Sequence, residues 1–233
     1  IMLFDTLLFD ADDTLFDFYA SGKKCFTETA TEFGFPQEKI DYDVYSEINQ
    51  KLWDKYSRGE LDKSSVLIGR YVEYNRVMNT TADPEEFQEN YEKKLETTCI
   101  LYPETRGVLE RLKRLGYRSY IITNGVKSVQ NNRLDLSMLR PLLSGVFISD
   151  EIGYAKPSDE FFNAVKNGIP DFTREKTLII GDSLVSDIPL GLKNGIKTCR
   201  ANYRKDANPE NVKYDYEIFN LGEIFAVLGE END

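Results

Sequence analysis

The sequence predicts an α/β fold, in which a parallel sheet is flanked by helices and a helical segment is inserted after the first strand. Three observations support this prediction. Short apolar runs end in polar residues, helical patterns separate the later runs, and residues 18–96 lack strand-like alternation. With 233 residues, of which 41% are apolar, the chain can form one core and an inserted subdomain.

The apolar runs indicate where the strands lie. Residues 7–9, 120–122 and 177–180 are bounded by turn-forming residues, as is typical of buried strands in a parallel sheet. Residues 146–149 and 197–201 are further strand candidates. Because ligands bind beyond the carboxyl ends of such strands, the polar residues that follow them could converge on one crevice.

Three helices are expected among these strands, at residues 103–115, 158–165 and 186–194. The first has apolar residues at helical spacing and is followed by Gly116, while the second begins with a capping serine, Ser158. Pro189 is tolerated only near a first turn, so the third helix should begin close to Asp187. This alternation predicts right-handed crossovers between parallel strands.

The segment between the first two strands differs from the rest, because it is rich in Glu, Lys, Tyr and Phe. Its helices are expected at residues 22–33, 42–56, 63–77 and 84–96. We expect residues 18–96 to form a separate helical domain over the carboxyl edge of the sheet. Residues 1–17 and 97–233 would form the α/β core.

The net charge of −11 and the absence of histidine exclude several classes of function. An acidic protein repels a nucleic-acid polymer. A chain without histidine cannot be a Ser–His or Cys–His hydrolase or a histidine phosphatase, and it lacks the ligand of most catalytic zinc sites. Acid–base chemistry near neutral pH must then come from carboxylates, Lys, Tyr, Cys or a metal-bound water.

Cysteine usage and hydropathy bear on location and partners. Cys25, Cys99 and Cys199 are far apart and form no CxxC motif, which predicts reduced thiols in a cytoplasmic protein. No stretch approaches the roughly 20 apolar residues of a membrane span, so a membrane is not an expected partner. A monomer and a homodimer are both compatible with the sequence.

Two carboxylates follow the first strand, at Asp10 and Asp12. Like charges at this spacing repel each other in a low-dielectric pocket, so either a cation is needed or one of the two carboxylates is protonated. Both conditions suit phosphoryl transfer, in which a magnesium ion holds Asp10 and Asp12 supplies a proton. A solvated acidic turn or a helix N-cap is an equally good interpretation of this motif alone.

Two further motifs could bind phosphate. Thr123-Asn124 ends the second strand, where a hydroxyl and backbone N–H groups can accept a phosphate, although helix capping explains this motif on its own. Lys156 precedes a proline and therefore lies on extended or turn backbone, where its charge could neutralise a phosphate. An ordinary surface lysine is the simpler interpretation of Lys156 in isolation.

A last acidic pair follows the third apolar run. Asp182 lies at the strand end and Asp187 near the start of the next helix. Hard oxygen ligands of this kind suit Mg²⁺, whereas acidic residues at a helix start can also stabilise the helix dipole.

In their order, strand context and spacing, the four motifs resemble the haloacid dehalogenase-like (HAD) hydrolase superfamily. The matching elements are Asp10-Ala11-Asp12 with Thr14-Leu15, Thr123-Asn124, Lys156-Pro157, and Gly181-Asp182 with Asp187. The resemblance covers the whole chain and implies a Rossmann-like core. It identifies the helical insertion with the cap of the C1-cap subfamily.

The resemblance implies a role for each residue. Asp10 is the nucleophile, and Asp12 protonates the leaving alkoxide and then activates water. Thr123 and the backbone of Asn124 bind the phosphoryl oxygens, and Lys156 stabilises the charge of the transition state and orients Asp10. Phosphoryl transfer depends mainly on such positioning and charge neutralisation.

The same resemblance implies a magnesium site. Its ligands are Asp10, the carbonyl group of Asp12 and Asp182, with Asp187 acting through water or supporting the other ligands. The carboxyl at position 12 favours a phosphatase over a dehalogenase, because halide leaves without a proton.

A finer resemblance indicates pyrimidine 5′-nucleotidases as the branch. It rests on Asp17-Phe18, Leu52-Trp53, Gly59-Glu60 and Arg70-Tyr71. Trp53 could stack on a base and Arg70 could bind its polar edge, although packing within the insertion explains both, and for Trp53 packing is favoured. The predicted substrate is a small phosphorylated metabolite such as a nucleoside 5′-monophosphate.

Alternatives remain open from the sequence. A phosphoglycolate phosphatase, a sugar phosphatase or a phosphomutase of the same fold would share nearly all of these features. A phospho-receiver module would be shorter and would lack the insertion, and a catalytically silent protein would not need the complete set of catalytic residues.

Overall fold

The computed structural model describes residues 2–230, which form two compact units. The core unit consists of the residues up to Asp17 and from Leu101 onward, and the helical unit is Phe18–Ile100. Phe16 and Leu101 form an isolated antiparallel bridge within the core unit. The chain therefore leaves and re-enters the core unit at adjacent positions.

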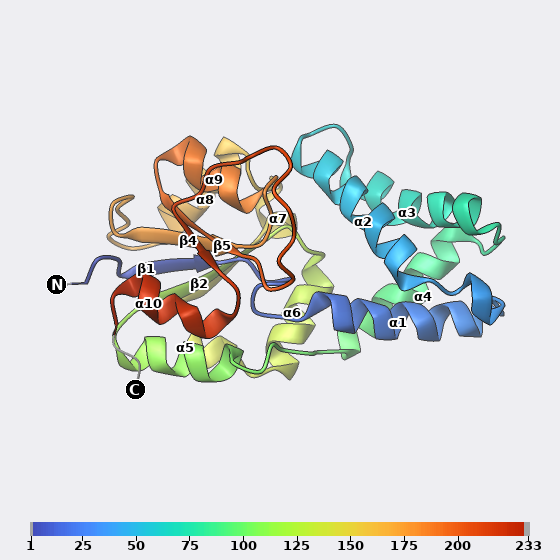
Figure 1. Cartoon of the computed structure of the whole chain (residues 1–233), viewed down its shortest axis with the longest axis horizontal. Helices are drawn as coiled ribbons and strands as arrows, with labels where there is room; N and C mark the ends of the chain where they lie inside the picture. Colours follow the sequence, from blue (N-terminus) through green and yellow to red (C-terminus); the bar gives the residue numbers. More distant parts are fainter. Residues whose placement is uncertain (1, 231–233) are drawn as a thin grey trace. The chain divides into compact units, whose positions relative to one another are not determined.

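Within the described residues, the core unit contains a six-stranded sheet in which every pairing is parallel (Figure 1). The strand order is β3-β2-β1-β4-β5-β6. The strands are β1 (Thr6–Phe9), β2 (Arg118–Thr123), β3 (Gly145–Ile148), β4 (Thr177–Gly181), β5 (Lys197–Ala201) and β6 (Tyr216–Ile218). The predicted α/β class is confirmed. The short strand β6 was not predicted, since three residues cannot establish a periodic pattern.

Helices cover both faces of the sheet, with α8 and α9 on one side and α5 and α10 on the other (Figure 1). The helices of the core unit are α5 (Thr105–Arg114), α6 (Lys127–Leu136), α7 (Ser149–Ile152), α8 (Asp159–Gly168), α9 (Asp187–Asn194) and α10 (Ile224–Leu228), with 3₁₀ turns η2 (Arg140–Leu142) and η3 (Leu221–Glu223). On the α8 and α9 side, Leu8, Ile122 and Ile179 from the strands pack against Phe161 and Leu190 in one buried cluster. This packing fixes the three central strands.

Local sequence signals set the helix starts as predicted. The Ser158 hydroxyl accepts a hydrogen bond from the backbone N–H of Phe161, which caps α8. Helix α9 begins at Asp187, so Pro189 lies in its first turn, where the missing N–H group costs no helical hydrogen bond. Gly195 ends α9 with a φ of 67°.

The helical unit contains α1 (Phe18–Glu32), η1 (Gln37–Lys39), α2 (Tyr42–Ser57), α3 (Lys63–Met78) and α4 (Pro84–Thr97). Aspartates cap three of these helices, since Asp41, Asp62 and Asp83 each accept hydrogen bonds from backbone N–H groups of the first turn. Buried aromatic side chains form its core, including Phe26, which stacks on Tyr45 with ring centroids 4.4 Å apart. Of the helices in residues 2–230, none combines the length and apolar character needed to traverse a bilayer.

Candidate active site

The register of the central strands brings three polar strand ends together. Phe9, the last residue of β1, is aligned with Ile121 of β2 and Ile180 of β4. The backbone N–H of Asp10 then donates to the carbonyl of Ile180 at 2.8 Å. The residues that directly follow β1 and β4, and those at the end of β2, therefore lie at one edge of the sheet.

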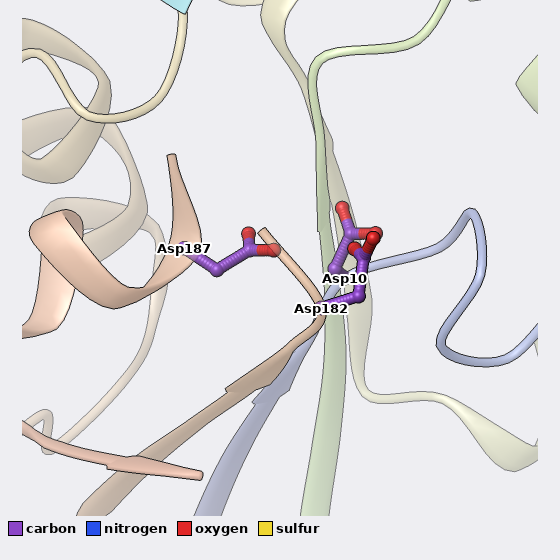
Figure 2. Close-up of side chains that lie close together, drawn as sticks. All are labelled: Asp10, Asp182 and Asp187. Carbon is purple, nitrogen blue, oxygen red and sulfur yellow. The ribbon is translucent and has the colours of Figure 1, made fainter. Parts of the chain in front are cut away.

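Three carboxylates meet at this edge. Asp10 follows β1, Asp182 follows β4 and Asp187 is the first residue of α9, and each offers an oxygen within 4.8 Å of the other two. Figure 2 shows the Asp187 carboxylate directed toward the other two. Asp10 and Asp187 are buried, and Asp182 is partly buried. Although these residues are far apart in the sequence, the parallel strands bring them to the same edge of the sheet.

Lys156 lies among these carboxylates and is only 1% exposed. Its ammonium group donates to Asp10 Oδ1 at 2.5 Å, to Asp187 Oδ1 at 2.6 Å and to the carbonyl of Ile122 at 2.8 Å. Burial alone would lower the pKa of Lys156, but the charges of Asp10 and Asp187 outweigh burial and raise it. Lys156 is therefore a fixed positive charge with all three protons engaged.

The Asn124 side chain holds the backbone that carries Lys156. Its amide group donates to the Lys156 carbonyl at 3.0 Å, and its carbonyl oxygen accepts from the Lys156 N–H at 2.8 Å. Thr123 is buried at the end of β2, and its hydroxyl oxygen accepts from the N–H of Gly125 at 3.0 Å. The end of β2 thus supports the Lys156 loop and presents a hydroxyl group at the same edge.

The buried carboxylate of Asp187 uses both of its oxygens. One accepts from Lys156, and Oδ2 accepts from the N–H of Ser183 at 3.1 Å. A side chain at Gly181 would place its Cβ 2.2 Å from Asp187 Oδ2. Glycine at position 181 is therefore required for the carboxylate to reach the site.

The charges of this cluster match a divalent cation. Burial raises the pKa of Asp10 from 3.8 to about 8, with Lys156 opposing the shift and the charges of Asp187 and Asp12 adding to it. Burial and the charge of Asp10 also raise the pKa of Asp182. Three carboxylates and one ammonium leave a formal charge of −2, and their hard oxygen atoms suit Mg²⁺. The residues present therefore fit the magnesium ion that the resemblance implies.

Asp12 makes contacts of a different kind. Its carboxylate accepts hydrogen bonds from two side chains of α6. Gln130 Nε2 donates to Oδ2 at 2.6 Å, and Arg133 donates to Oδ1 at 2.5 Å. Asp13 continues the turn with a φ of 57°, a conformation that aspartate tolerates better than most residues. Gln130 and Arg133 could not be recognised from the sequence, because polar residues one helical turn apart usually mark a solvated face.

Trp53 and Arg70 lie in the helical unit, and their contacts there are local. Arg70 is buried and donates to the side-chain oxygens of Asn49 at 2.9 Å and Gln88 at 2.5 Å. Trp53 meets Tyr56 edge to face, with ring centroids 5.5 Å apart. These contacts favour the packing interpretation of both residues.

Comparison with known proteins establishes the family. Residues 4–195 match the family described as haloacid dehalogenase-like hydrolase. The chain belongs to the haloacid dehalogenase-like hydrolases, as its four motifs predicted, and it is therefore a hydrolase.

Several relatives align along almost the whole chain. The HAD-hydrolase YfnB of Bacillus subtilis strain 168 is 34% identical over 97% of this chain and 96% of its own length. A crystal structure of YfnB bound to magnesium matches with a TM-score of 0.89 and 33% identity, covering 97% of this chain and 98% of that one. The pyrimidine 5′-nucleotidases PynA of Streptococcus pneumoniae R6 and YjjG of Escherichia coli K12 are each 29% identical over 97% of this chain, covering 96% and 99% of their own lengths. The predicted resemblance to this branch is confirmed.

Proposed function

We propose that the chain is a magnesium-dependent phosphomonoesterase that uses Asp10 as its nucleophile. The observation that carries this proposal is the buried cluster in which Lys156 contacts Asp10 and Asp187 beside Asp182. Burying such a cluster costs free energy, because each ion loses its hydration. A role in chemistry explains why the charges are nevertheless buried. A cluster with a net negative charge, one fixed cation and a candidate nucleophile suits phosphoryl transfer.

In the first step, an oxygen of Asp10 attacks the phosphorus atom and the ester P–O bond breaks. Asp12 donates its proton to the leaving alkoxide, which departs as an alcohol. The Thr123 hydroxyl and backbone N–H groups at the end of β2 hold the phosphoryl oxygens. Lys156 orients Asp10 through the 2.5 Å contact and offsets the negative charge of the transferring group.

In the second step, Asp12 removes a proton from a water molecule, whose oxygen attacks the phosphorus atom. The bond between phosphorus and Asp10 breaks, which releases inorganic phosphate and restores the Asp10 carboxylate. Asp12 regains its proton and can serve the next cycle. One residue thus acts first as an acid and then as a base.

Asp10, Asp182 and the carbonyl group of Asp12 would hold the magnesium ion, and Asp187 would support Lys156 and the Ser183 backbone. When bound, Mg²⁺ supplies positive charge that favours the ionised form of Asp10 and neutralises phosphate oxygens. Without the ion, burial raises the pKa of Asp10, and a protonated carboxyl is a poor nucleophile. We therefore expect the activity to depend on Mg²⁺.

The proposed substrates are nucleoside 5′-monophosphates. Support comes from PynA and YjjG, pyrimidine 5′-nucleotidases that match nearly the full chain. A panel of nucleoside monophosphates, phosphoglycolate and sugar phosphates tests this assignment. Pyrimidine nucleotides are expected to give the highest kcat/KM, and a preference for either other class would contradict it.

The activity itself is tested with p-nitrophenyl phosphate, with Mg²⁺ present or removed by chelation. We expect chelation to abolish turnover and Asp10→Asn to lower kcat by about 10⁴-fold or more, because covalent catalysis loses its nucleophile. Asp159→Asn, at an exposed carboxylate on α8, is the matched control. Substantial turnover by Asp10→Asn would overturn the assignment of the nucleophile.

A further inference from the structure

Two side chains of α6 bind Asp12 at both of its carboxylate oxygens. Gln130 and Arg133 are three residues apart and therefore lie on the same face of the helix. The Gln130 amide donates to Oδ2 at 2.6 Å and the Arg133 guanidinium donates to Oδ1 at 2.5 Å. With one donor on each oxygen, the plane of the carboxylate is fixed and each oxygen retains a further lone pair.

Arg133 is itself held in place by the turn that carries Asp12. Its side chain is fully buried, and its guanidinium carbon lies 4.4 Å from the centroid of the Phe16 ring. Phe16 is also fully buried and forms a backbone bridge with Asp12. Arg133 of α6 therefore contacts this turn at two points, the Phe16 ring and the Asp12 carboxylate.

Gln130 occupies a space that Gly125 leaves open. A Cβ at Gly125 would come within 2.2 Å of Gln130 Nε2, the atom that donates to Asp12. Gly125 follows Thr123-Asn124 at the end of β2. The same connection that presents the Thr123 hydroxyl therefore also makes room for the donor of Asp12.

This arrangement is a poor device for stability alone. A fully buried guanidinium loses its hydration, whereas the side chain of its partner Asp12 is 28% exposed and shares its charge with solvent. The contact does, however, fix the direction of a carboxylate whose remaining lone pairs stay accessible. Fixed direction is what an acid–base group requires, since misplacement by about 1 Å can slow a reaction by about 10²-fold.

We infer that Gln130 and Arg133 are positioning residues for Asp12, which hold its carboxylate toward the leaving oxygen in the first step and toward water in the second. The inference rests on the proposed acid–base role of Asp12. Neither residue exchanges a proton with the substrate. Loss of either donor leaves Asp12 present but held at only one of its carboxylate oxygens.

The first test compares leaving groups in Gln130→Met and Arg133→Met. An alkoxide leaving group needs the proton of Asp12, whereas p-nitrophenolate leaves without much assistance. We expect kcat/KM for a nucleoside 5′-monophosphate to fall by about 10- to 100-fold and that for p-nitrophenyl phosphate to fall much less. Asn132→Ala, at an exposed position of the same helix, should change neither. Equal losses for both substrates would overturn the inference, as would no loss.

The second test repeats these substitutions in an Asp12→Asn background. If both residues act through Asp12, each should reduce kcat by less than about twofold there, because the coupled effects are not additive. Losses as large as in the parent protein would show that the two residues act elsewhere. Should Arg133→Met not fold, as judged by thermal unfolding, Gln130→Met and Arg133→Lys carry both tests.

The acid–base role of Asp12 and the positioning role of Gln130 and Arg133 can be tested separately. If Asp12→Asn retains full turnover, the acid–base assignment in the proposed function is wrong. If Asp12→Asn is slow but the Gln130 and Arg133 variants do not distinguish the two leaving groups, only the positioning role is wrong.

Discussion

Lys156 of the core unit and Arg70 of the helical unit are both buried cations, but their charges are compensated in different ways. Lys156 of the core unit is 1% exposed and contacts two carboxylates, those of Asp10 and Asp187. Arg70 of the helical unit is 3% exposed, and its side chain donates to the neutral amides of Asn49 and Gln88 and to the carbonyl of Leu67. The charge of Glu92, which accepts a hydrogen bond from Gln88, also acts on Arg70.

Aromatic rings complete the surroundings of Arg70. Its guanidinium carbon lies 5.1 Å from the ring centroid of Tyr71, 5.4 Å from that of Tyr91 and 5.9 Å from that of Tyr45. Rings and amides stabilise a cation without adding charge. Lys156 instead joins a cluster with a surplus of negative charge. We therefore expect the unbalanced buried charge around Lys156, rather than burial of a cation alone, to mark the functional site.

Removing Lys156 should have the largest effect. In Lys156→Met the carboxylates of Asp10 and Asp187 lose their buried partner, so the free energy of unfolding should fall by about 3–5 kcal/mol. We expect kcat/KM to fall by about 10²- to 10³-fold as well, since charge on the transferring group is no longer offset. Urea unfolding and steady-state kinetics measure the two effects. Lys193→Met, which removes an exposed lysine of α9, is the control, and an equal loss there would contradict the argument.

The surplus of negative charge around Lys156 also predicts how the stability of the folded chain depends on pH. The pKa of Asp10 is about 8 in the folded chain without metal and 3.8 ordinarily. A carboxyl whose pKa is raised by folding stabilises the folded state below its unfolded pKa, and this contribution is lost as the pH rises through the folded pKa. We expect the metal-free protein to lose a few kcal/mol between about pH 5 and pH 9.

Mg²⁺ should counteract this loss, because a divalent cation favours the ionised carboxylate. Thermal unfolding in chelator and in Mg²⁺, measured across the same pH range, provides the comparison. Identical pH dependence with and without Mg²⁺ would contradict the proposed metal site.

Replacing Arg70 should affect stability but not catalysis. Arg70→Met leaves the buried oxygens of Asn49 and Gln88 without their donor, which should lower the free energy of unfolding by about 2–3 kcal/mol. We expect kcat and KM of the folded enzyme to change by less than about twofold, since packing alone is lost. Arg76→Met, at an exposed arginine of the same helix, controls for lost charge. A large change in KM for nucleotides would show that Arg70 contacts the substrate.

The smallest effect is expected at Trp53. Its ring lies edge to face with Tyr56, and Lys63 Nζ lies 5.7 Å from its centroid. Trp53→Ala should destabilise the chain by about 1 kcal/mol through the loss of these contacts. KM for a nucleoside monophosphate should stay within about twofold of the parent value. A tenfold rise confined to nucleotides, with p-nitrophenyl phosphate unaffected, would assign Trp53 to base binding instead.

Much of the core unit could be predicted from the sequence because its signals are local. Apolar runs ending in polar residues located β1, β2 and β4, and a proline placed the start of α9 at Asp187. Strand ends in a parallel sheet share one edge, so the meeting of Asp10 with Asp182 followed from topology.

The contacts that sequence reasoning missed all depend on tertiary structure. Arg133 is fully buried although its sequence context resembles a solvated helix face, and the Asn124 amide that pairs with the Lys156 backbone carries no periodic signal. For Arg70 the sequence left a ligand contact and packing both open, and its described partners within the helical unit favour packing. Partner choice between distant segments cannot be read from local patterns.

The proposed mechanism requires catalysis to pass through a phosphorylated Asp10. Asp12→Asn should slow release of phosphate more than formation of the intermediate, so the phosphoenzyme should accumulate when this variant is mixed with Mg²⁺ and p-nitrophenyl phosphate and then quenched in acid. Mass spectrometry of the digested protein should find one phosphoryl group on the peptide that contains Asp10, and none when Asp10 is also replaced by Asn. Phosphorylation at another residue, or turnover by the parent enzyme with no trapped intermediate in Asp12→Asn, would show that Asp10 is not the nucleophile.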